Sequence, residues 1–503
     1  MFCVAFALLC AVSAPEAPIF AINEDNSHYY FTRTLADMTK ASLEAWVDQY
    51  ANTGVTHLFL NPNAMRASYK SAVWDTIWEC GEQTPPEPGS GDENWLRNCK
   101  ALYDAGLDPY AVWIQRCRER GISAWISMRM NDVHCVDNPK HCYHSSFWAH
   151  HPEFRRDAAN TGSWVAQALD YGHPEVREYV MAFVKELFER YDMDGLELDW
   201  MRFGWHFKTG EEEQGRILLN EFMRQTRAFA TEWSAKRGHP IQVGARVPTH
   251  PDAAAGLGMD GVTWAREGWV DLLVPTPFWA ATDFDIPVEL WKERIGAEAL
   301  AKVKLLPGCE NLLRAWPGGE AITNDLASAR GFAVAHLERG ADGIYYFNYM
   351  DSDTTLLGGP GTYHDLLAGG LAPGFLKTQP LRYMVSYRDT VPPGFDAEVR
   401  LPVSNAASFQ MVAGPVEHAD MFVRLGFASA VPADAKPLEV RVNGAVCVPA
   451  EPPVGGTIPG AKEARCFAIP EGMAKAGANH VEIGPETLPA QVVWVELTQL
   501  PKQ

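Results

Sequence analysis

The segment Tyr191–Phe203, YDMDGLELDWMRF, has the composition of a buried β-strand that carries two acids. Successive side chains of a strand point to opposite faces, so Glu197 and Asp199 share one face while Leu198 points to the other. Two carboxylates on the inner face of a strand cost free energy unless they have partners or a chemical role. This strand therefore predicts either a buried ion-pair network or a catalytic site.

Apolar runs of strand length alternate with helical segments from Pro18 to Met350. The segments between the runs have helical periodicity, and several end at a glycine, as helices often do. Eight strands in alternation with helices predict an α/β fold of the TIM (β/α)8 barrel type over residues 15–355. A doubly wound sheet is the rival fold, but its glycine-rich phosphate turn is missing after the early strands. The eight runs are residues 18–23, 55–63, 122–132, 194–203, 241–250, 271–277, 303–311 and 342–350.

The pattern changes on either side of the predicted barrel. Residues 356–380 are rich in glycine and proline and predict a linker. Short alternating runs then predict a β-sandwich over residues 381–503, similar in style to carbohydrate-binding modules, which either binds glycan or caps the barrel. Residues 1–14 resemble a signal peptide and predict export to the periplasm or the outside of the cell. Cys10 also allows a lipid-anchored form at the cell surface.

Composition limits the partners. A net charge of −20 argues against nucleic acid, because phosphate binding needs clustered lysine and arginine. No segment after the leader is long and apolar enough for a transmembrane helix. No cysteine pair has zinc spacing, so neither a metal nor another cofactor is expected, and the oligomeric state stays open. In an exported chain, disulfides are possible between the near neighbours Cys80 and Cys99, Cys135 and Cys142, and Cys447 and Cys466.

Polar side chains gather at the carboxyl ends of the predicted strands. In a TIM barrel these ends meet at one face, where active sites are built. The long loops 80–95 and 134–157 would wall this face, and tryptophans in other loops offer platforms for sugar rings. The residues expected to bind substrate are Asn61, Arg129, Asn131, Asp132, His134, Glu197, Arg202, Trp205, Arg246, His250, Trp279, Tyr346 and Asn348.

Two acids, Asp199 in the fourth run and Glu310 in the seventh, are expected at the carboxyl ends of their strands, where they face each other across the predicted mouth. Glycoside hydrolysis needs such a pair: one acid protonates the leaving oxygen, and the other attacks the sugar or activates water. We therefore expect a hydrolase of poly- or oligosaccharides with a retaining mechanism, in which Glu310 is the nucleophile and Asp199 the acid and base. An alternative makes Asp199 the nucleophile and takes the acid from Asp283 or Asp285.

This arrangement of acids resembles that of the large clan of retaining TIM-barrel glycosidases, although that clan has Asn-Glu on strand four where this chain has ELDW. The fourth run is more similar to bacterial glycoside hydrolase-like proteins described as family-10-like, which implies a secreted glycosidase barrel without naming its substrate. The run also resembles the chitinase motif Asp-Gly-x-Asp-x-Asp-x-Glu through Asp194, Gly195, Glu197 and Asp199. Met201 stands where that motif has its catalytic Glu, which argues against chitinolysis.

Three arginines, Arg129, Arg202 and Arg246, are expected on adjacent strand ends. They either neutralise the acids of the site or bind an anionic sugar, a uronate or a sulfated one, since a guanidinium pairs with such groups in bidentate fashion. Glu197 lies one layer below Asp199, which predicts a structural acid paired with a barrel arginine.

Two other classes of function are open. The methionine at position 201 allows a non-catalytic glycan-binding protein on a decayed barrel. A metal-dependent hydrolase would use His134, His250 and Asp199, although the first run lacks the usual His-x-His. The glycoside hydrolase is the function that the strand ends favour.

Overall fold

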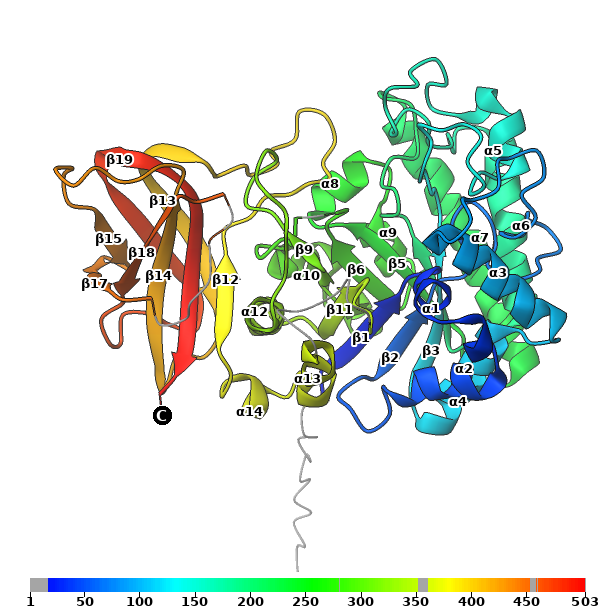
Figure 1. Cartoon of the computed structure of the whole chain (residues 1–503), viewed down its shortest axis with the longest axis horizontal. Helices are drawn as coiled ribbons and strands as arrows, with labels where there is room; N and C mark the ends of the chain where they lie inside the picture. The colour runs from blue at the N-terminus through cyan, green and yellow to red at the C-terminus, as the bar shows by residue number, and fades with distance from the viewer. Residues whose placement is uncertain (1–16, 280, 352–360, 453–457, 459, 503) are drawn as a thin grey trace, which may run out of the picture.

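The structure is a computed structural model that describes residues 17–279, 281–351, 361–452, 458 and 460–502. The predicted signal peptide with Cys10 and part of the predicted linker lie outside these residues. The described chain forms an α/β barrel, in the centre and right of Figure 1, and an antiparallel β domain on the left. The predicted combination of a TIM barrel and a C-terminal β domain is confirmed.

Parallel strands close the barrel in the order β7-β6-β5-β4-β3-β2-β1-β11-β8. The segments β7 and β8 are two halves of one strand, so the barrel has eight. Between them the N–H of Leu306 donates to Leu273, and the carbonyl of Pro307 accepts from Tyr345. Pro307 has no N–H to donate, which divides the strand. The bounds are β1 Ile19–Glu24, β2 His57–Leu60, β3 Ser123–Arg129, β4 Gly195–Asp199, β5 Gln242–Pro248, β6 Leu272–Thr276, β7 Lys304–Leu305, β8 Gly308–Glu310 and β11 Gly343–Phe347.

Helices surround the barrel strands (Figure 1). Local sequence sets their ends: at α4 the Asp108 side chain accepts the N–H of Tyr110, and Gly121, at φ 71°, ends the helix. The helices are α1 His28–Thr32, α2 Lys40–Asp48, α3 Gly91–Asp104, α4 Pro109–Arg120, α5 Ser146–His150, α6 Pro174–Arg190, α7 Glu212–Arg237, α8 Pro251–Gly256, α9 Gly261–Arg266, α10 Val288–Ile295, α11 Ala297–Leu300, α12 Leu326–Glu338, α13 Thr362–Gly369 and α14 Pro373–Leu376, with 3-10 turns at Leu35–Asp37 and Pro152–Phe154.

The barrel interior is filled by apolar side chains. Trp125 is the largest of them, and two glycines make room for it: a Cβ on Gly195 would lie 2.5 Å from its ring, and one on Gly244 would lie 3.0 Å away. The polar strand ends therefore lie above a closed apolar layer and not above a pore. The layer consists of Ala21, Phe59, Trp125, Leu272, Val274, Leu306, Tyr345 and Phe347.

The C-terminal domain is built around one long strand, β19. Its first half pairs with β13 and β15, and its second half pairs with β12 and β14. The strands are β12 Leu381–Met384, β13 Val403–Ala413, β14 Ala419–Phe427, β15 Glu439–Val442, β16 Ala445–Val446, β17 Val448–Ala450, β18 Glu463–Ala468 and β19 Gly477–Pro501, and a separate small hairpin joins β9 Leu312–Leu313 to β10 Ile322–Thr323.

The two domains meet where α12 packs on β12. Gly331 allows the close approach, because a Cβ there would lie 2.0 Å from the carbonyl oxygen of Arg382. The Arg382 guanidinium pairs with Glu496 of β19 at 2.6 Å and with Asp325, the N-cap of α12. These contacts fix the β domain to the barrel.

The described cysteines are free in this structure. Cys80 is hydrogen-bonded to Cys142, a partner that sequence spacing did not suggest, and this bond lowers the pKa of Cys80 to about 7. The loops that carry the two residues also pair through the N–H of Thr84 and the carbonyl of Lys140, at 2.7 Å. Among the helices of the described chain, none is both long and apolar enough for a membrane span.

Candidate active site

A row of alternating charges crosses the barrel mouth. The parallel register pairs Arg129 of β3 with Asp199 of β4, and Asp199 with Arg246 of β5. Two residues earlier on β4, Glu197 occupies the next lower level, beside Ser127. The inward-facing positions inferred from the sequence therefore lie together above the apolar layer.

Asp199 is fully buried, and both of its oxygens have partners. Oδ2 accepts from Arg246 Nη1 at 2.6 Å, and Oδ1 accepts the N–H groups of Met201 and Arg202, each at 3.1 Å. Burial acts to lower the pKa of Arg246, but Asp199 and the other acids nearby raise it overall. Three hydrogen-bond donors around the two oxygens of Asp199 are the arrangement expected for an ionised carboxylate, which only accepts.

Glu197 has hydroxyl partners in place of the predicted arginine. Ser127 Oγ donates to Glu197 Oε1 at 2.6 Å, and the Tyr345 hydroxyl donates to the same oxygen at 2.8 Å. Oε2 is buried, and no described residue bonds to it. Burial, together with the negative charge of Asp199, raises the pKa of Glu197 to about 8. The side chain thus links β3, β4 and β11 just below the mouth.

Glu310, at the end of β8, has a different environment from Asp199. It is 1% exposed; Oε1 accepts only the N–H of Asn311, at 3.1 Å, and Oε2 has no partner among the described residues. Burial raises the pKa of Glu310 to about 8, although Arg202 and Arg246 act in the opposite direction. Near neutral pH, Glu310 is therefore protonated.

A second polar network lies on the rim. Arg129 pairs with Asp25 and, at 3.3 Å, with Asp132. His134 Nδ1 lies 2.9 Å from the Asp132 carboxylate, and Nε2 lies 3.1 Å from Arg202 Nη2. A guanidinium only donates, so Nε2 is the acceptor and the proton is on Nδ1. The sequence interpretation missed Asp25, although the same rule of polar strand ends applies to it, one residue beyond β1.

Two of the three predicted asparagines bond to backbone groups through their side chains. The Asn131 side chain donates to two loop carbonyls at 2.9 and 3.2 Å, and Asn61 Oδ1 accepts the N–H two residues further along the chain at 3.2 Å. Asn348 is half-buried and its backbone is in the left-handed region, at φ 55°; within the described part of the chain its side-chain oxygen has no partner. Asn131 thus positions the loops that form the rim.

Two predicted residues lie outside the mouth. His250 caps α8, because its Nδ1 accepts the N–H of Asp252 at 3.2 Å. Tyr346 points into the helical layer, where its hydroxyl donates to a carbonyl of α12 at 3.0 Å. Its neighbours Tyr345 and Phe347 face the interior. The sequence interpretation was therefore off by one position on β11.

An aromatic cluster extends from the mouth to the surface. Trp164 is 40% exposed, and its ring centre lies 5.2–5.3 Å from those of Phe203, Trp205 and Phe278. Trp205 was predicted, as was Trp279, which is half-exposed beside Phe278 in the chain. Trp164 belongs to a long loop after β3, and nothing in its local sequence indicates that it reaches the mouth.

The segment 385–400, between β12 and β13, reaches back over the mouth. Asp389 accepts the N–H groups of Phe278 at 2.9 Å and Trp279 at 2.7 Å. Burial raises the pKa of Asp389 to about 6. The negative charge of Asp389 in turn helps to raise the pKa of Glu310. The C-terminal chain is therefore part of this site, which no pattern in the sequence indicated.

A cavity of about 470 Å³ adjoins the aromatic cluster. Trp205 forms part of its wall, and Arg156, Lys208 and Glu212 add polar groups. Pro393, from the segment over the mouth, lines it as well. The cavity continues the aromatic surface away from the acids.

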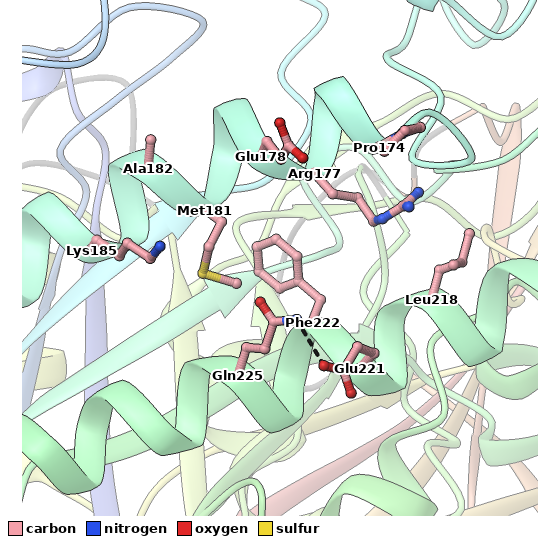
Figure 2. Close-up of a pocket in the computed structure, with 10 residues that line it drawn as sticks. All are labelled: Pro174, Arg177, Glu178, Met181, Ala182, Lys185, Leu218, Glu221, Phe222 and Gln225. Carbon is pink, nitrogen blue, oxygen red and sulfur yellow. Dashed lines mark hydrogen bonds between the residues drawn. The ribbon is translucent and has the colours of Figure 1, made fainter.

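A separate groove of about 390 Å³ lies between α6 and α7 on the outer layer (Figure 2). Met181 and Phe222 lie among charged residues, and Gln225 donates to Glu221 at 2.8 Å. Two helices form this groove without any strand end, whereas barrel active sites are built at strand ends. It is not part of the candidate site.

The residues considered for a metal-dependent hydrolase do not meet. His134 contacts Asp132 and Arg202, while His250 caps α8 and Asp199 is bound to Arg246. In the part of the chain that the structure describes, no three His, Cys, Asp or Glu side chains are placed to hold a metal ion.

Part of the chain matches a known family. Residues 67–235 match the family Glycosyl hydrolase-like 10. The matched region includes Arg129, Glu197, Asp199 and Arg202, and it stops before Arg246 and Glu310. The resemblance inferred from the fourth strand is confirmed over this region, which supports a glycoside hydrolase-like, glycan-acting protein.

Solved structures of three glycosidases also show similarity. The α-L-fucosidase isoenzyme 1 from Paenibacillus thiaminolyticus is 11% identical, with 92% of this chain and 95% of that chain covered and a TM-score of 0.34. A GH36 α-galactosidase from Geobacillus stearothermophilus is 12% identical, with 96% of this chain and 55% of that chain covered and a TM-score of 0.37. A chitinase from Paenibacillus sp. str. FPU-7 is 13% identical, with 95% of this chain and 53% of that chain covered and a TM-score of 0.39. The chain spans little more than half of the latter two. No curated protein matches the sequence.

Proposed function

We propose that the chain is a glycoside hydrolase in which Asp199 and Glu310 are the reacting carboxyl groups. The observation that carries the proposal is the contrast between their surroundings. Asp199 is held as an anion by Arg246 and two N–H groups, while Glu310 has an unpartnered oxygen and a pKa raised to about 8. Two carboxyl groups with opposite protonation at one pH supply the anion and the acid that glycoside hydrolysis uses.

These surroundings favour roles opposite to those expected from the sequence. Glu310 protonates the leaving oxygen, and Asp199 attacks the anomeric carbon to form a glycosyl ester. Glu310, now ionised, then takes a proton from the water that cleaves the ester, so the configuration is retained. Asp283 and Asp285, the alternative candidates for the general acid, lie near arginines instead. Asp285 pairs with Arg339 at 2.7 Å, and Asp283 lies 4.0 Å from Arg388.

Access to the pair requires movement. Asp199 and Glu310 are covered in this structure, and Arg202 of the rim network is itself only 8% exposed. A sugar that packs on the aromatic cluster reaches the acids once the segment 385–400 shifts. Closure over bound substrate excludes water, which strengthens the interactions of charged groups.

The proposal keeps the other features expected from the sequence. The substrate is a poly- or oligosaccharide with negatively charged groups, and the protein is exported through residues 1–14, as a free or lipid-anchored form. The β domain supports the site through the segment 385–400, in agreement with the capping role considered above.

A non-catalytic glycan-binding protein is the second candidate. The burial of both acids and the methionine at position 201 favour it. In that case the exposed aromatic cluster binds glycan, and Asp199 and Arg246 form only a structural ion pair.

Release of reducing ends separates the two candidates. The wild type is incubated with neutral, uronate-containing and sulfated polysaccharides beside Asp199→Asn and Glu310→Gln. Matched controls are Asp104→Asn and Glu221→Gln, which change exposed acids far from the mouth. A glycoside hydrolase loses its activity in the first two variants and keeps it in the controls. Glycan binding without release by the wild type identifies the binding protein.

A further inference from the structure

The three arginines of the mouth differ in their partners. Arg129 pairs with Asp25 and Asp132, and Arg246 pairs with Asp199. Both are therefore occupied by acids of the protein itself, and the sequence-based idea that arginines neutralise the site holds for these two.

Arg202 has no carboxylate partner among the described residues. It is 8% exposed, Nη2 contacts His134 Nε2 at 3.1 Å, and Nε is buried without a partner. Asp25 and Asp132 act on its charge from a distance but do not contact it. A buried guanidinium whose donors are unused is costly, because each lost hydrogen bond to water is not replaced.

Glu310, whose Oε2 has no partner among the described residues, does not fill this place. Glu310 influences Arg202 electrostatically, but its own pKa of about 8 leaves it neutral near pH 7. Burial and the positive charge of Arg129 lower the pKa of Arg202. An anionic ligand group would supply the missing acceptor and offset that repulsion.

The surroundings of Arg202 suit a sugar. Its guanidinium lies 5.2 Å from the ring centre of Phe203 and 5.7 Å from that of Phe347. Phe203 in turn packs against the exposed Trp164. The unused donors therefore lie next to apolar rings against which the face of a pyranose packs.

We propose that Arg202 binds a carboxylate or sulfate group of the sugar that enters the mouth. The planar guanidinium offers two parallel donors to either group, a geometry that lysine does not reproduce. The inference rests on the proposed function, since it assigns the substrate class of the same site. His134 and Asp132 hold the guanidinium in place through the contact to Nη2.

Calorimetric titration of the full chain tests this with matched ligand pairs. Oligogalacturonate is compared with its carboxyl-reduced form, and sulfated carrageenan oligosaccharides with their desulfated form, so that the two anions are separated. The proteins are the wild type, Arg202→Gln, Arg202→Lys and the control Arg216→Gln, which changes a half-buried arginine of α7 that pairs with Asp260. Thermal unfolding checks that each variant is folded.

The wild type and Arg216→Gln should bind one anionic ligand at least about tenfold more tightly than its neutral counterpart, because hydrogen bonds between charged groups are stronger than neutral ones. Arg202→Gln should abolish the difference, and Arg202→Lys should retain only part of it.

Three outcomes decide between the inference and the function. Equal binding and cleavage of neutral and anionic ligands would overturn the inference and leave the glycoside hydrolase intact. Arg202-dependent binding of an anionic ligand without hydrolysis would support the inference and overturn the hydrolase. Absence of binding to every ligand would overturn both.

Discussion

The substitutions Asp199→Asn and Glu310→Gln should differ in their effect on stability, and Asp199→Asn should have the larger one. Asp199→Asn keeps the shape of the side chain but leaves Arg246 buried and uncompensated, since the two were joined at 2.6 Å. Breaking a buried ion pair in this way costs about 3–5 kcal/mol. With an unfolding entropy of about 2.1 cal/mol/K per residue, a barrel of roughly 335 residues changes by about 0.7 kcal/mol per degree. The melting temperature should fall by about 4–7 °C.

Glu310→Gln should behave differently, because glutamine has the shape of the protonated acid. The pKa of Glu310 is raised from 4.5 to about 8. The contribution of its neutral form to the stability of the folded protein is therefore complete below pH 4.5 and is lost as the pH rises to about 8. At pH 5 the variant should therefore match the wild type within about 2 °C. At pH 9 it should be the more stable protein, because the wild type then buries an ionised Glu310.

Differential scanning calorimetry at pH 5, 7 and 9 measures these differences. The control is Asp104→Asn, which removes an exposed acid that pairs with Lys100; such a pair contributes little. The reasoning is refuted if Asp199→Asn melts at the same temperature as the control. It is also refuted if Glu310→Gln loses as much stability at pH 5 as Asp199→Asn does.

Three further results are expected. Hydrolysis should fall as the pH rises past about 8, because Glu310 then loses the proton it donates; a rate that stays level to pH 10 would exclude Glu310 as the acid. Trp164→Ala should weaken glycan binding about tenfold by calorimetric titration, because the exposed face of the aromatic cluster is removed; unchanged affinity would place the sugar elsewhere. At pH 7.5 iodoacetamide should label Cys80 before the other described cysteines, and Cys142→Ala should slow that labelling because the bond that lowers the pKa of Cys80 is gone. Mass spectrometry of the labelled peptides measures this, and equal labelling rates in both proteins would contradict the role of that bond.

Most of the barrel could be predicted because its strands are continuous apolar runs between helical segments. Alternation along β4 predicted that Glu197 and Asp199 share one face. The register with β3 and β5 places Asp199 beside two arginines as expected, but it places Glu197 beside Ser127 and Gly244. Sequence did not indicate that Pro307 divides the seventh strand, since an unpaired position in a ladder depends on the neighbouring strands.

Less of the site could be predicted, since it depends on contacts between distant segments. On β11 the hydroxyl of Tyr345, and not that of the predicted Tyr346, reaches the acids, because Tyr346 points to α12. Trp164 and Asp389 reach the mouth through a long loop and through the chain beyond the barrel, where no periodicity fixes direction. Asp199 was correctly considered for a salt bridge, yet only the structure identifies Arg246 as its partner and shows Arg202 without a carboxylate partner among the described residues.

The stereochemistry of azide rescue tests the central claim most directly. A substrate cleaved by the wild type is incubated with Asp199→Asn or Glu310→Gln and sodium azide, and the glycosyl azide is analysed by NMR. We expect Asp199→Asn to give the azide with inverted configuration, because azide replaces the nucleophile, and Glu310→Gln to give the azide with retained configuration. The opposite pair of products, or full hydrolysis by either variant without azide, would contradict the assignment of Asp199 as nucleophile and Glu310 as acid.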